Sequence, residues 1–324
     1  MKILLLILLL MSKIQGQKLD AIDINLRNLN DVLETAQRSS QKVFVDDFTG
    51  LLWPYCPSAS FAISEMLDLY PETLISVEWH SSGFTPGNSD FDIPAYSTRA
   101  ALYNVGGIPH TQWNGVGSTV GGYPNGNWQA FIGEFTNTYN SMVGEETPYN
   151  IDINGYAGNT VNYDVTISMD SDMSSSNQKV DVFLAEDNIW SYWSGASSYH
   201  NARFVAREWL SSEYLSISSA GQSETFSGSF EYNGNWNSDS LFLIAIVQNY
   251  SSKQIYQASK VNINDMDPDI DDDGILNNTD NCIEDYNPQQ EDIDNDQIGD
   301  ACDPCNNLIY TLGNPNGDTN INGD

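Results

Sequence analysis

Carboxylates recur at every second residue in two short stretches near the C-terminal end of the sequence. The first ladder is Asp269-Asp271-Asp273, and the second is Asp292-Asp294-Asp296. Both lie in residues 265–303, which carry fifteen carboxylates and no Lys or Arg. A helix would scatter these side chains, and a strand would place them on one repelling face. A tight loop around a divalent cation would instead turn alternate oxygens inward and neutralise them.

The spacing matches the calcium loop of an EF-hand, in which ligands occupy positions 1, 3, 5, 7, 9 and 12 and glycine occupies position 6. The expected ligands of the first loop are Asp269, Asp271, Asp273, the carbonyl of Ile275, Asn277 and Asp280, with Gly274 at the turn. Those of the second loop are Asp292, Asp294, Asp296, the carbonyl of Ile298, Asp300 and Asp303. Only Gln297, at position 6, departs from the pattern. Flexible, all-oxygen ligation favours calcium over zinc and magnesium.

These residues resemble the thrombospondin type 3 repeat, through DxDxDGIxxxxDNC and then NPxQxDxDxDxIGDACD. The resemblance implies calcium held by Asp side chains on a compact array with almost no apolar core. It also implies a disulfide between Cys282 and Cys302. The alternative is a solvated, disordered acidic linker. A linker requires neither a glycine at the turn position nor two cysteines.

Further oxygen ligands are candidates on both sides of this segment. Asp265 and Asp267 precede the first ladder. Asp318, Asn320 and Asn322 resemble the opening of a dockerin-like calcium loop. The chain stops before position 12 of that loop, so we expect a fragment of a longer protein, with the partner of Cys305 in the missing part.

Charge and the N-terminal sequence indicate an exported protein. Lys and Arg number 12 against 44 Asp and Glu, a net charge of -32, which disfavours nucleic acid and anionic membranes as partners. Lys2, an apolar run and a polar exit near Gly16 are typical of a secretory signal peptide over residues 1–16. We expect no transmembrane segment. The predicted location is secreted, cell-surface or outer-membrane-associated, where calcium is plentiful and disulfides persist.

The N-terminal half alternates strand-like and helix-like patterns. The predicted strands cover residues 42–48, 73–79 and 106–115, and the predicted helices cover 58–70, 98–103 and 128–142. This order predicts an α/β domain over residues 42–147. Residues 17–41 are polar with spaced leucines and are expected to form a lead-in arm.

A second resemblance concerns the turn after the first of these strands. Phe48 to Pro57 resembles the FTGTWCGYCP active-site turn of secreted thioredoxin-like proteins, and Ile108-Pro109 resembles their cis-proline. A looser similarity extends to the Omp28-like outer-membrane family, which couples such a domain to a β-rich one. Trp53 stands where the family has its first cysteine, so a dithiol cycle within this turn is not possible.

Cys56 alone remains, and two interpretations stay open. At a helix start, with His80 and His110 as candidate neighbours and Pro109 facing it, it would serve a monothiol enzyme or an extracytoplasmic thiol–disulfide oxidoreductase. Otherwise it is a buried small residue in a domain without redox chemistry.

From Pro148 onward, apolar and polar residues alternate in several stretches, a pattern typical of β-strands. The clearest cover residues 160–169, 179–185, 226–232, 241–247 and 254–261. They predict an antiparallel β-sandwich over residues 148–263, with immunoglobulin-like architecture. Between them, residues 188–210 concentrate aromatic side chains: Trp190, Tyr192, Trp193, Tyr199 and Trp209. These form either a platform for a glycan or peptide, or the packing of a hairpin and a domain contact.

The sequence therefore predicts a multidomain protein. The two domains above precede a calcium-binding repeat segment over residues 264–304 with little regular secondary structure, and then a linker and incomplete loop over residues 305–324. The leading function is Ca²⁺ binding with a structural, adhesion or presentation role, and an extracellular protein or glycan as partner. A thiol-dependent enzyme and a glycan-binding module are the alternatives.

Overall fold

The computed structural model describes the chain from residue 39 to residue 303, with short gaps. The described residues are 39–85, 91, 93–158, 160–174, 177–231, 233–266, 269, 271, 273–275, 279–294 and 296–303. The predicted signal peptide, most of the lead-in arm and the tail from residue 304 lie outside the described residues. So do Asp267, Asn277, Cys305, Asp318, Asn320 and Asn322. We call residues 39–266 the body and residues 269–303 the repeat segment.

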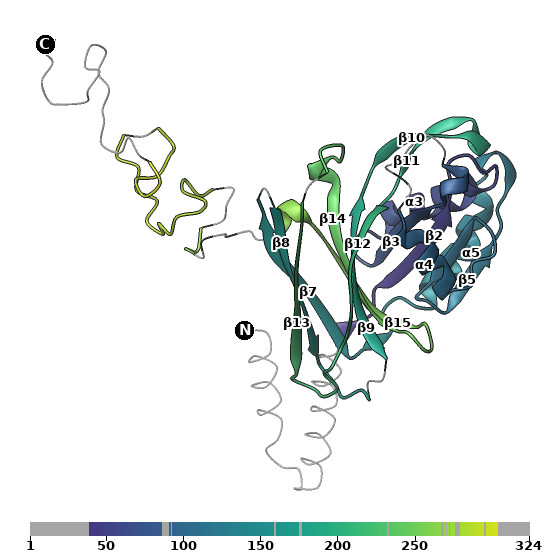
Figure 1. Ribbon diagram of the computed structural model, residues 1–324, viewed down its shortest axis with the longest axis horizontal. Helices are drawn as coiled ribbons and strands as arrows, with labels where there is room; N and C mark the ends of the chain where they lie inside the picture. The colour runs from purple at the N-terminus through teal and green to yellow at the C-terminus, as the bar shows by residue number, and fades with distance from the viewer. Residues whose placement is uncertain are drawn as a thin grey trace, which may run out of the picture.

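One eight-stranded sheet runs through the body in the order β15-β14-β9-β12-β3-β2-β4-β5 (Figure 1). The bounds are β2 Val43–Thr49, β3 Leu74–His80, β4 His110–Trp113, β5 Gly117–Val120, β9 Gln178–Glu186, β12 Val205–Tyr214, β14 Leu241–Asn249 and β15 Ile255–Asn262. The β2–β3 and β3–β12 pairs are parallel, and the other neighbours are antiparallel. Strands from both sides of residue 148 therefore share one sheet, joined where β12 lies beside β3.

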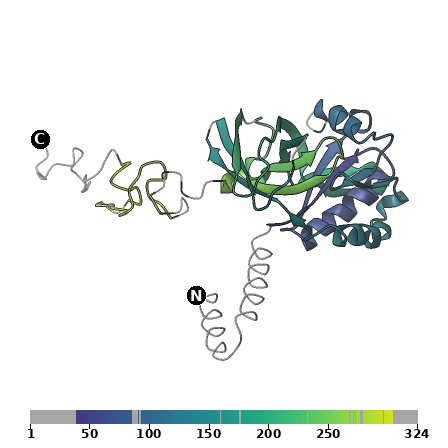
Figure 2. The same cartoon turned by 90° about the horizontal axis from the view of Figure 1, so that it is seen from below.

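Helices cover both faces of the N-terminal half of this sheet. They are α3 Cys56–Leu69, α4 Ala95–Leu102 and α5 Gln129–Asn140. Asp46 and Asp47 are adjacent on β2 and so point to opposite faces. Ser60 of α3 donates to Asp47 at 2.7 Å, whereas Arg99 of α4 donates to Asp46 at 2.9 Å. The helices α3 and α4 therefore lie on opposite faces, as the blue and purple helices in Figure 2 do.

A second sheet packs against the C-terminal half of the first. It consists of β7 Tyr149–Ala157, β8 Thr160–Met169 and β13 Ser223–Glu231, all antiparallel, in the order β13-β8-β7. Val161 and Val165 alternate with exposed polar residues on β8, and they share one buried cluster with Val182 and Leu243 of the large sheet. Apolar alternation along each strand thus produces two stacked sheets with a common core.

The strands β9 and β14 are apolar on both faces because each of them separates two cores. On β9, Phe183 joins the cluster beneath the helices, while Val182 and Leu184 join the cluster between the sheets. The same division holds along β14, whose continuous apolar run predicted a central strand. The prediction is confirmed, since β14 lies between β9 and β15.

Smaller elements complete the body. The hairpin is β10 Ile189–Trp193 with β11 Ser198–Ala202, and β1 Ser39–Ser40 pairs with β6 Glu146–Thr147. Single turns of 3-10 helix cover Ser82–Phe84, Pro124–Gly126, Ser194–Ala196, Ser238–Ser240 and Ile263–Asp265. The described part of the repeat segment contains neither helix nor strand. Across the described residues, no helix combines the length and the apolar character that crossing a bilayer requires.

A fully buried ion-pair network ties the two halves of the body together. Nε and Nη2 of Arg99 each donate to a carboxylate oxygen of Asp46 at 2.9 Å. Its Nη1 donates to Gln248 at 2.7 Å and to Asp181 at 3.4 Å. All three charged side chains have no exposed surface. One side chain of α4 therefore bonds to β2, β9 and β14 at once.

Candidate functional site

The first Asp ladder is folded into a compact loop by its own backbone amides. The Gly274 amide donates to Oδ2 of Asp269 at 3.0 Å. The amides of Asp273 and Ile275 donate to Oδ1 of Asp271 and of Asp273, at 3.1 and 2.7 Å. Gly274 has φ +91°, which glycine adopts without a steric penalty. One oxygen of each of the three Asp lies within 4.8 Å of the other two.

The second ladder repeats this geometry residue by residue. The Gln297 amide donates to Oδ2 of Asp292 at 3.0 Å. The amides of Asp296 and Ile298 donate to Oδ1 of Asp294 and of Asp296, at 3.3 and 2.9 Å. The three Asp again bring one oxygen each within 4.8 Å of one another. Gln297 has φ +79°, so it occupies the left-handed conformation without the freedom of glycine.

The carboxylates at position 12 act electrostatically on the ladders that precede them. Loss of hydration raises the pKa of Asp271, and neighbouring carboxylates, Asp280 among them, raise it further. The pKa of Asp294 is raised in the same way, with Asp303 among the contributing charges. In each loop, the carboxylate that the EF-hand spacing assigns to position 12 thus helps to raise the pKa of the middle Asp of the ladder.

The first loop contains carboxylate oxygens that the protein itself does not satisfy. Oδ2 of Asp271 and Oδ2 of Asp280 are buried and accept no hydrogen bond from the described residues. Asp273 is buried as well, with 8% of its surface exposed. Buried acceptors without donors are costly, and a cation would relieve both this cost and the mutual repulsion. Because every candidate ligand is an oxygen, the donor set suits a hard divalent ion.

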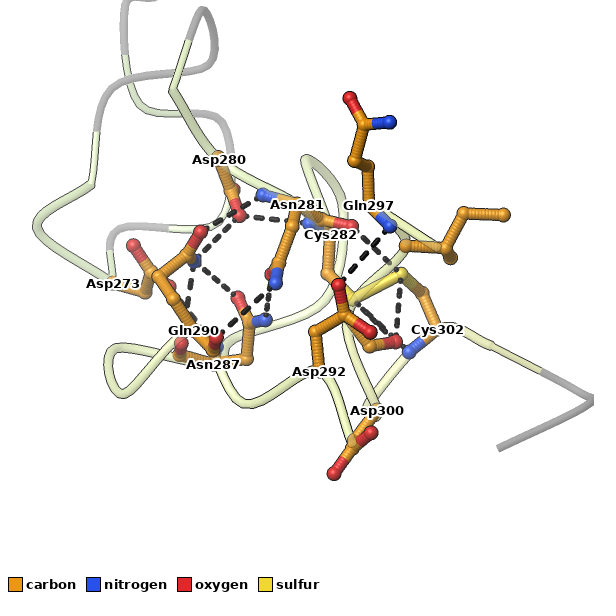
Figure 3. The surroundings of a disulfide bond; sticks show 12 residues. Asp273, Asp280, Asn281, Cys282, Asn287, Gln290, Asp292, Gln297, Asp300 and Cys302 are labelled. Carbon is orange, nitrogen blue, oxygen red and sulfur yellow. Dashed lines mark hydrogen bonds between the residues drawn. A yellow bond between two sulfur atoms is a disulfide. The ribbon is translucent and has the colours of Figure 1, made fainter. Parts of the chain in front are cut away.

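A disulfide between Cys282 and Cys302 closes the segment, as the resemblance implied, with a Cα–Cα distance of 5.6 Å. Gly299 lies against it. A Cβ at Gly299 would come within 2.6 Å of the sulfur of Cys282 and within 2.3 Å of Oδ1 of Asn281. Only glycine fits this approach. Figure 3 shows Asp292 and Gln297 close to the disulfide, with Asp273 and Asp280 farther from it.

Two residues between the loops hold the first loop in place, and sequence reasoning gave them no role. The Asn287 backbone amide donates to Oδ2 of Asp273 at 3.0 Å. The Gln290 side chain donates to Oδ1 of Asp280 at 2.7 Å and accepts from the Asn281 amide at 2.9 Å. Their signal is the amide-rich stretch around Asn287-Pro288-Gln289-Gln290, placed between two sets of carboxylates.

The other candidate ligands are placed differently or lie outside the described residues. Asp265 ends the last turn of the body. Oδ1 of Asp300 accepts the Ile293 amide at 2.9 Å, a structural role inside the second loop. The positions of Asp267, Asn277, Asp318, Asn320 and Asn322 are not among those described.

Cys56 lies at the start of α3, as expected, but it is fully buried. Burial, first of all, raises the pKa of its thiol far above the ordinary value, and the charges of Asp47 and Glu78 act in the same direction. It shares an apolar cluster with Leu51 and Trp193. A protonated, enclosed thiol is a poor nucleophile.

The hairpin covers this turn directly. The Ser194 amide donates to the Leu51 carbonyl at 2.9 Å. Gly195 lies so close to Pro54 that a Cβ would come within 2.3 Å of the Pro54 carbonyl oxygen. The stretch that resembles a redox turn is therefore packed against another part of the body.

The histidines considered as partners of Cys56 pair with other side chains. Nε2 of His80 lies 3.0 Å from Oε2 of Glu78, and both residues are buried. Burial raises the pKa of Glu78 to about 8 and lowers that of His80 to about 3, the charge of Arg207 adding to the effect on His80. His110, next to the cis Ile108–Pro109 peptide, lies 3.1 Å from Gln112.

The aromatic side chains of residues 188–210 divide between the two interpretations. Trp193 is fully buried, and Trp209 packs edge-on to Trp79 with the ring centroids 6.4 Å apart. Trp190, Tyr192 and Tyr199 are exposed on the hairpin. Packing therefore accounts for the first two residues and leaves the other three on the surface.

The fold and this segment define the class: a β-rich protein of several sheets, extended by an acidic segment that a disulfide closes. No family model matches the sequence, and no curated protein matches it. Among solved structures, the chain is similar to HBP35 of Porphyromonas gingivalis, at 16% identity and a TM-score of 0.54, covering 70% of this chain and 76% of that one. At this identity the likeness is one of fold.

Two further structures share less of the geometry. A protein from Agrobacterium tumefaciens is 16% identical over 70% of this chain and 97% of that chain, with a TM-score of 0.45. A domain of the outer membrane lipoprotein Omp28 from Porphyromonas gingivalis is 13% identical over 36% of this chain and 87% of that chain, with a TM-score of 0.26. These TM-scores are too low to argue from.

Proposed function

We propose that the chain is a secreted or cell-surface protein that binds Ca²⁺ in the two loops of the repeat segment. The observation that carries this proposal is the repetition of one hydrogen-bond pattern around two Asp ladders. Two loops with unrelated roles are not expected to share both an amide-to-carboxylate hydrogen-bond pattern and a left-handed turn at the same position. Two loops that bind the same kind of ion are.

Calcium suits the donor set better than other metal ions. Zinc sites use sulfur and nitrogen ligands, and here the only sulfurs of the described repeat segment are joined in a disulfide. Magnesium requires a near-ideal octahedron and retains water, whereas up to six protein oxygens per loop fit the higher coordination number of calcium. The carboxylates would hold the ion, and the ion would screen their repulsion.

The role that follows is structural. Without an apolar core, the repeat segment would depend on the disulfide and on bound ions for a fixed shape. Loaded with calcium, it would act as a stiff spacer between the body and whatever follows it. This supports presentation or adhesion at a surface, in agreement with the predicted signal peptide.

The body would serve as a scaffold. We propose that its N-terminal part is thioredoxin-like, on the basis of the order β2-α3-β3-α4-β4-β5-α5. Its stacked sheets support an immunoglobulin-like sandwich less directly, because one of them continues into the N-terminal part. The burial of Cys56 supports a non-redox scaffold.

Equilibrium dialysis with radioactive calcium tests the proposed function. Wild type is expected to bind two ions, one in each ladder. The variant Asp271→Asn with Asp294→Asn should lose most of this binding. The control, Glu213→Gln with Glu231→Gln, removes two exposed carboxylates from the body and should bind like wild type. Equal binding by all three proteins would contradict the proposal.

The enzyme alternative has its own test. Insulin reduction by wild type and by Cys56→Ser is expected to be absent in both cases. Reduction that depends on Cys56 would show that the buried thiol becomes accessible and would restore the oxidoreductase interpretation.

A further inference from the structure

The hairpin β10–β11 carries aromatic rings on its outer face that the fold does not use. Trp190 is 67% exposed, Tyr192 46% and Tyr199 57%. Tyr192 and Tyr199 face each other across the two strands, and Trp190, two residues before Tyr192 on β10, is the diagonal neighbour of Tyr199. Exposing three large rings in one place is unfavourable for a protein with no use for them.

The inner face of the same hairpin packs against α3. Trp193 is buried against Phe61 of α3, with ring centroids 5.5 Å apart. His200 stacks on the same Phe61 at 4.0 Å and 19°. These contacts and the bond from Ser194 to Leu51 anchor the hairpin without help from its outer side chains.

The outer rings pack against one another. Trp190 and Tyr199 lie 15° from parallel, with centroids 6.0 Å apart, and Tyr192 stands at 61° to Tyr199 at 5.2 Å. Because the strands and the buried inner face fix the backbone, little ordering is needed when a ligand stacks on these rings. The hairpin lies at an edge of the body in Figure 1.

The hairpin that carries the rings is polar, and the carboxylate that precedes it, Asp187, is buried and paired with Arg203 at 2.7 Å. Residues 188–202 contain no Asp, Glu, Lys or Arg, although the whole chain has 56 such residues, 44 acidic and 12 basic. Asn188 and Asn201 lie at the open end of the hairpin, joined by a bond of 3.4 Å, with Asn201 opposite Trp190. Amides beside flat rings offer hydrogen bonds and stacking at once.

We propose that this face of the hairpin binds a neutral glycan. The apolar faces of a pyranose would stack on Trp190 and Tyr199, and its hydroxyls would bond to the neighbouring amides. A cationic peptide would find no free carboxylate on this face, because Asp187 is buried and paired with Arg203. An anionic glycan would be repelled by a net charge of -32. The site is independent of the calcium loops.

The test uses the full chain and two soluble probes, the hexasaccharides of β-1,4-linked glucose and of β-1,4-linked N-acetylglucosamine. Wild type should bind at least one of them, with a change in tryptophan fluorescence. The variant Trp190→Ala with Tyr199→Ala should lose about tenfold or more in affinity. Tyr214→Ala is the control, since Tyr214 is 65% exposed on β12 and outside the hairpin, and it should bind like wild type.

Two results would overturn the proposal. They are no binding of either hexasaccharide by folded wild type, and equal binding by the double variant. The variant removes only exposed rings, and circular dichroism will show whether it is folded. Binding should persist in EGTA, so that a failure of the calcium proposal and a failure of this one remain distinguishable.

Discussion

The body and the repeat segment treat carboxylates in opposite ways. In the body, Asp46 and Asp181 are buried without exposed surface, and each contacts the guanidinium of Arg99. In the repeat segment, each Asp ladder is surrounded by further carboxylates, and its hydrogen bonds come from backbone amides. Arg99 thus supplies the counter-charge for these two carboxylates, whereas residues 265–303 contain no Lys or Arg and, under the proposed function, would obtain a counter-charge from solution.

The body and the repeat segment also differ in how many apolar side chains they bury. The body has two large clusters beneath and between its sheets. In the repeat segment Cys282 is the only described residue in the buried apolar set, and Ile293 and Ile298 are about half exposed. One region should therefore be insensitive to calcium and the other should depend on it, and the following changes test this contrast from the largest expected effect to the smallest.

Replacing Arg99 by Met should destabilise the body most. The change leaves Asp46 and Asp181 buried without their cation, which typically costs about 3–5 kcal/mol of unfolding free energy. Urea unfolding followed by tryptophan fluorescence measures it, because all eight Trp lie between residues 53 and 236.

The matched control is Asp68→Asn, which breaks the 2.9 Å pair between Asp68 and Arg203 at the surface, where Asp68 is 70% exposed. It should cost less than about 1 kcal/mol. Equal effects of the two variants would mean that the buried network does not hold the halves of the body together.

Removing the disulfide should act on the other region alone. Cys282→Ser with Cys302→Ser opens a link over a separation of 20 residues, worth about 3 kcal/mol in loop-closure entropy. We expect rapid proteolysis within residues 269–303, weaker calcium binding and an unchanged unfolding midpoint for the body. Wild type treated with dithiothreitol should behave in the same way, and a shifted midpoint of body unfolding would contradict the separation of the two regions.

The buried Glu78 predicts a pH dependence confined to the body. Burial raises the pKa of Glu78 from 4.5 to about 8, so the folded state binds more protons than the unfolded state, and stability falls as pH rises through this range. The depressed pKa of His80, about 3, gives the opposite trend, but only below 6.5. Above pH 6.5 the Glu78 effect therefore remains.

Between pH 6.5 and 8, the unfolding free energy of Glu78→Gln should fall by about 1–2 kcal/mol less than that of wild type, at roughly 1.4 kcal/mol per pKa unit. Urea midpoints at both pH values measure this change. Glu72→Gln, at an exposed position, should keep the wild-type dependence. A steeper loss in Glu78→Gln than in wild type would reverse the sign and contradict the assignment.

The smallest effect concerns the turn position of the second loop. Gln297 has φ +79°, and glycine relieves the strain of a left-handed residue, about 1 kcal/mol. Gln297→Gly should therefore tighten calcium binding at the second ladder by a few-fold. The reciprocal change, Gly274→Gln, should weaken the first ladder by a similar factor, and calcium titrations of both variants compare them. Effects of the same sign in the two variants would mean that the two turn positions are not equivalent.

The elements of the body that alternate cleanly could be predicted from the sequence. The central strand β14, the strand β8 and the helix α5 lie where their periodicity placed them. The strand β12 could not be predicted, because Val205–Tyr214 mixes charged, aromatic and hydroxyl side chains and its pairing with β9 contains two register shifts. Without β12, no pattern in the sequence indicates that one sheet crosses residue 148.

For the candidate site, the sequence predicts the ligand positions but not the contacts around them. Ligand spacing is local, so positions 1, 3, 5 and 6 of each loop could be assigned from the chain alone. Contacts that hold the first loop in place are not local, and the bonds from the Asn287 backbone and the Gln290 side chain follow only from the fold of the segment. The burial of Cys56 depends on a hairpin some 140 residues further along the chain.

Calorimetric titration of calcium into the oxidised protein tests the contrast between the two regions most directly. We predict heat of binding that saturates near two ions per chain, one for each Asp ladder, with the tryptophan signal of the body unchanged. No heat of binding up to millimolar calcium would contradict it, because the clustered carboxylates would then be tolerated without any cation.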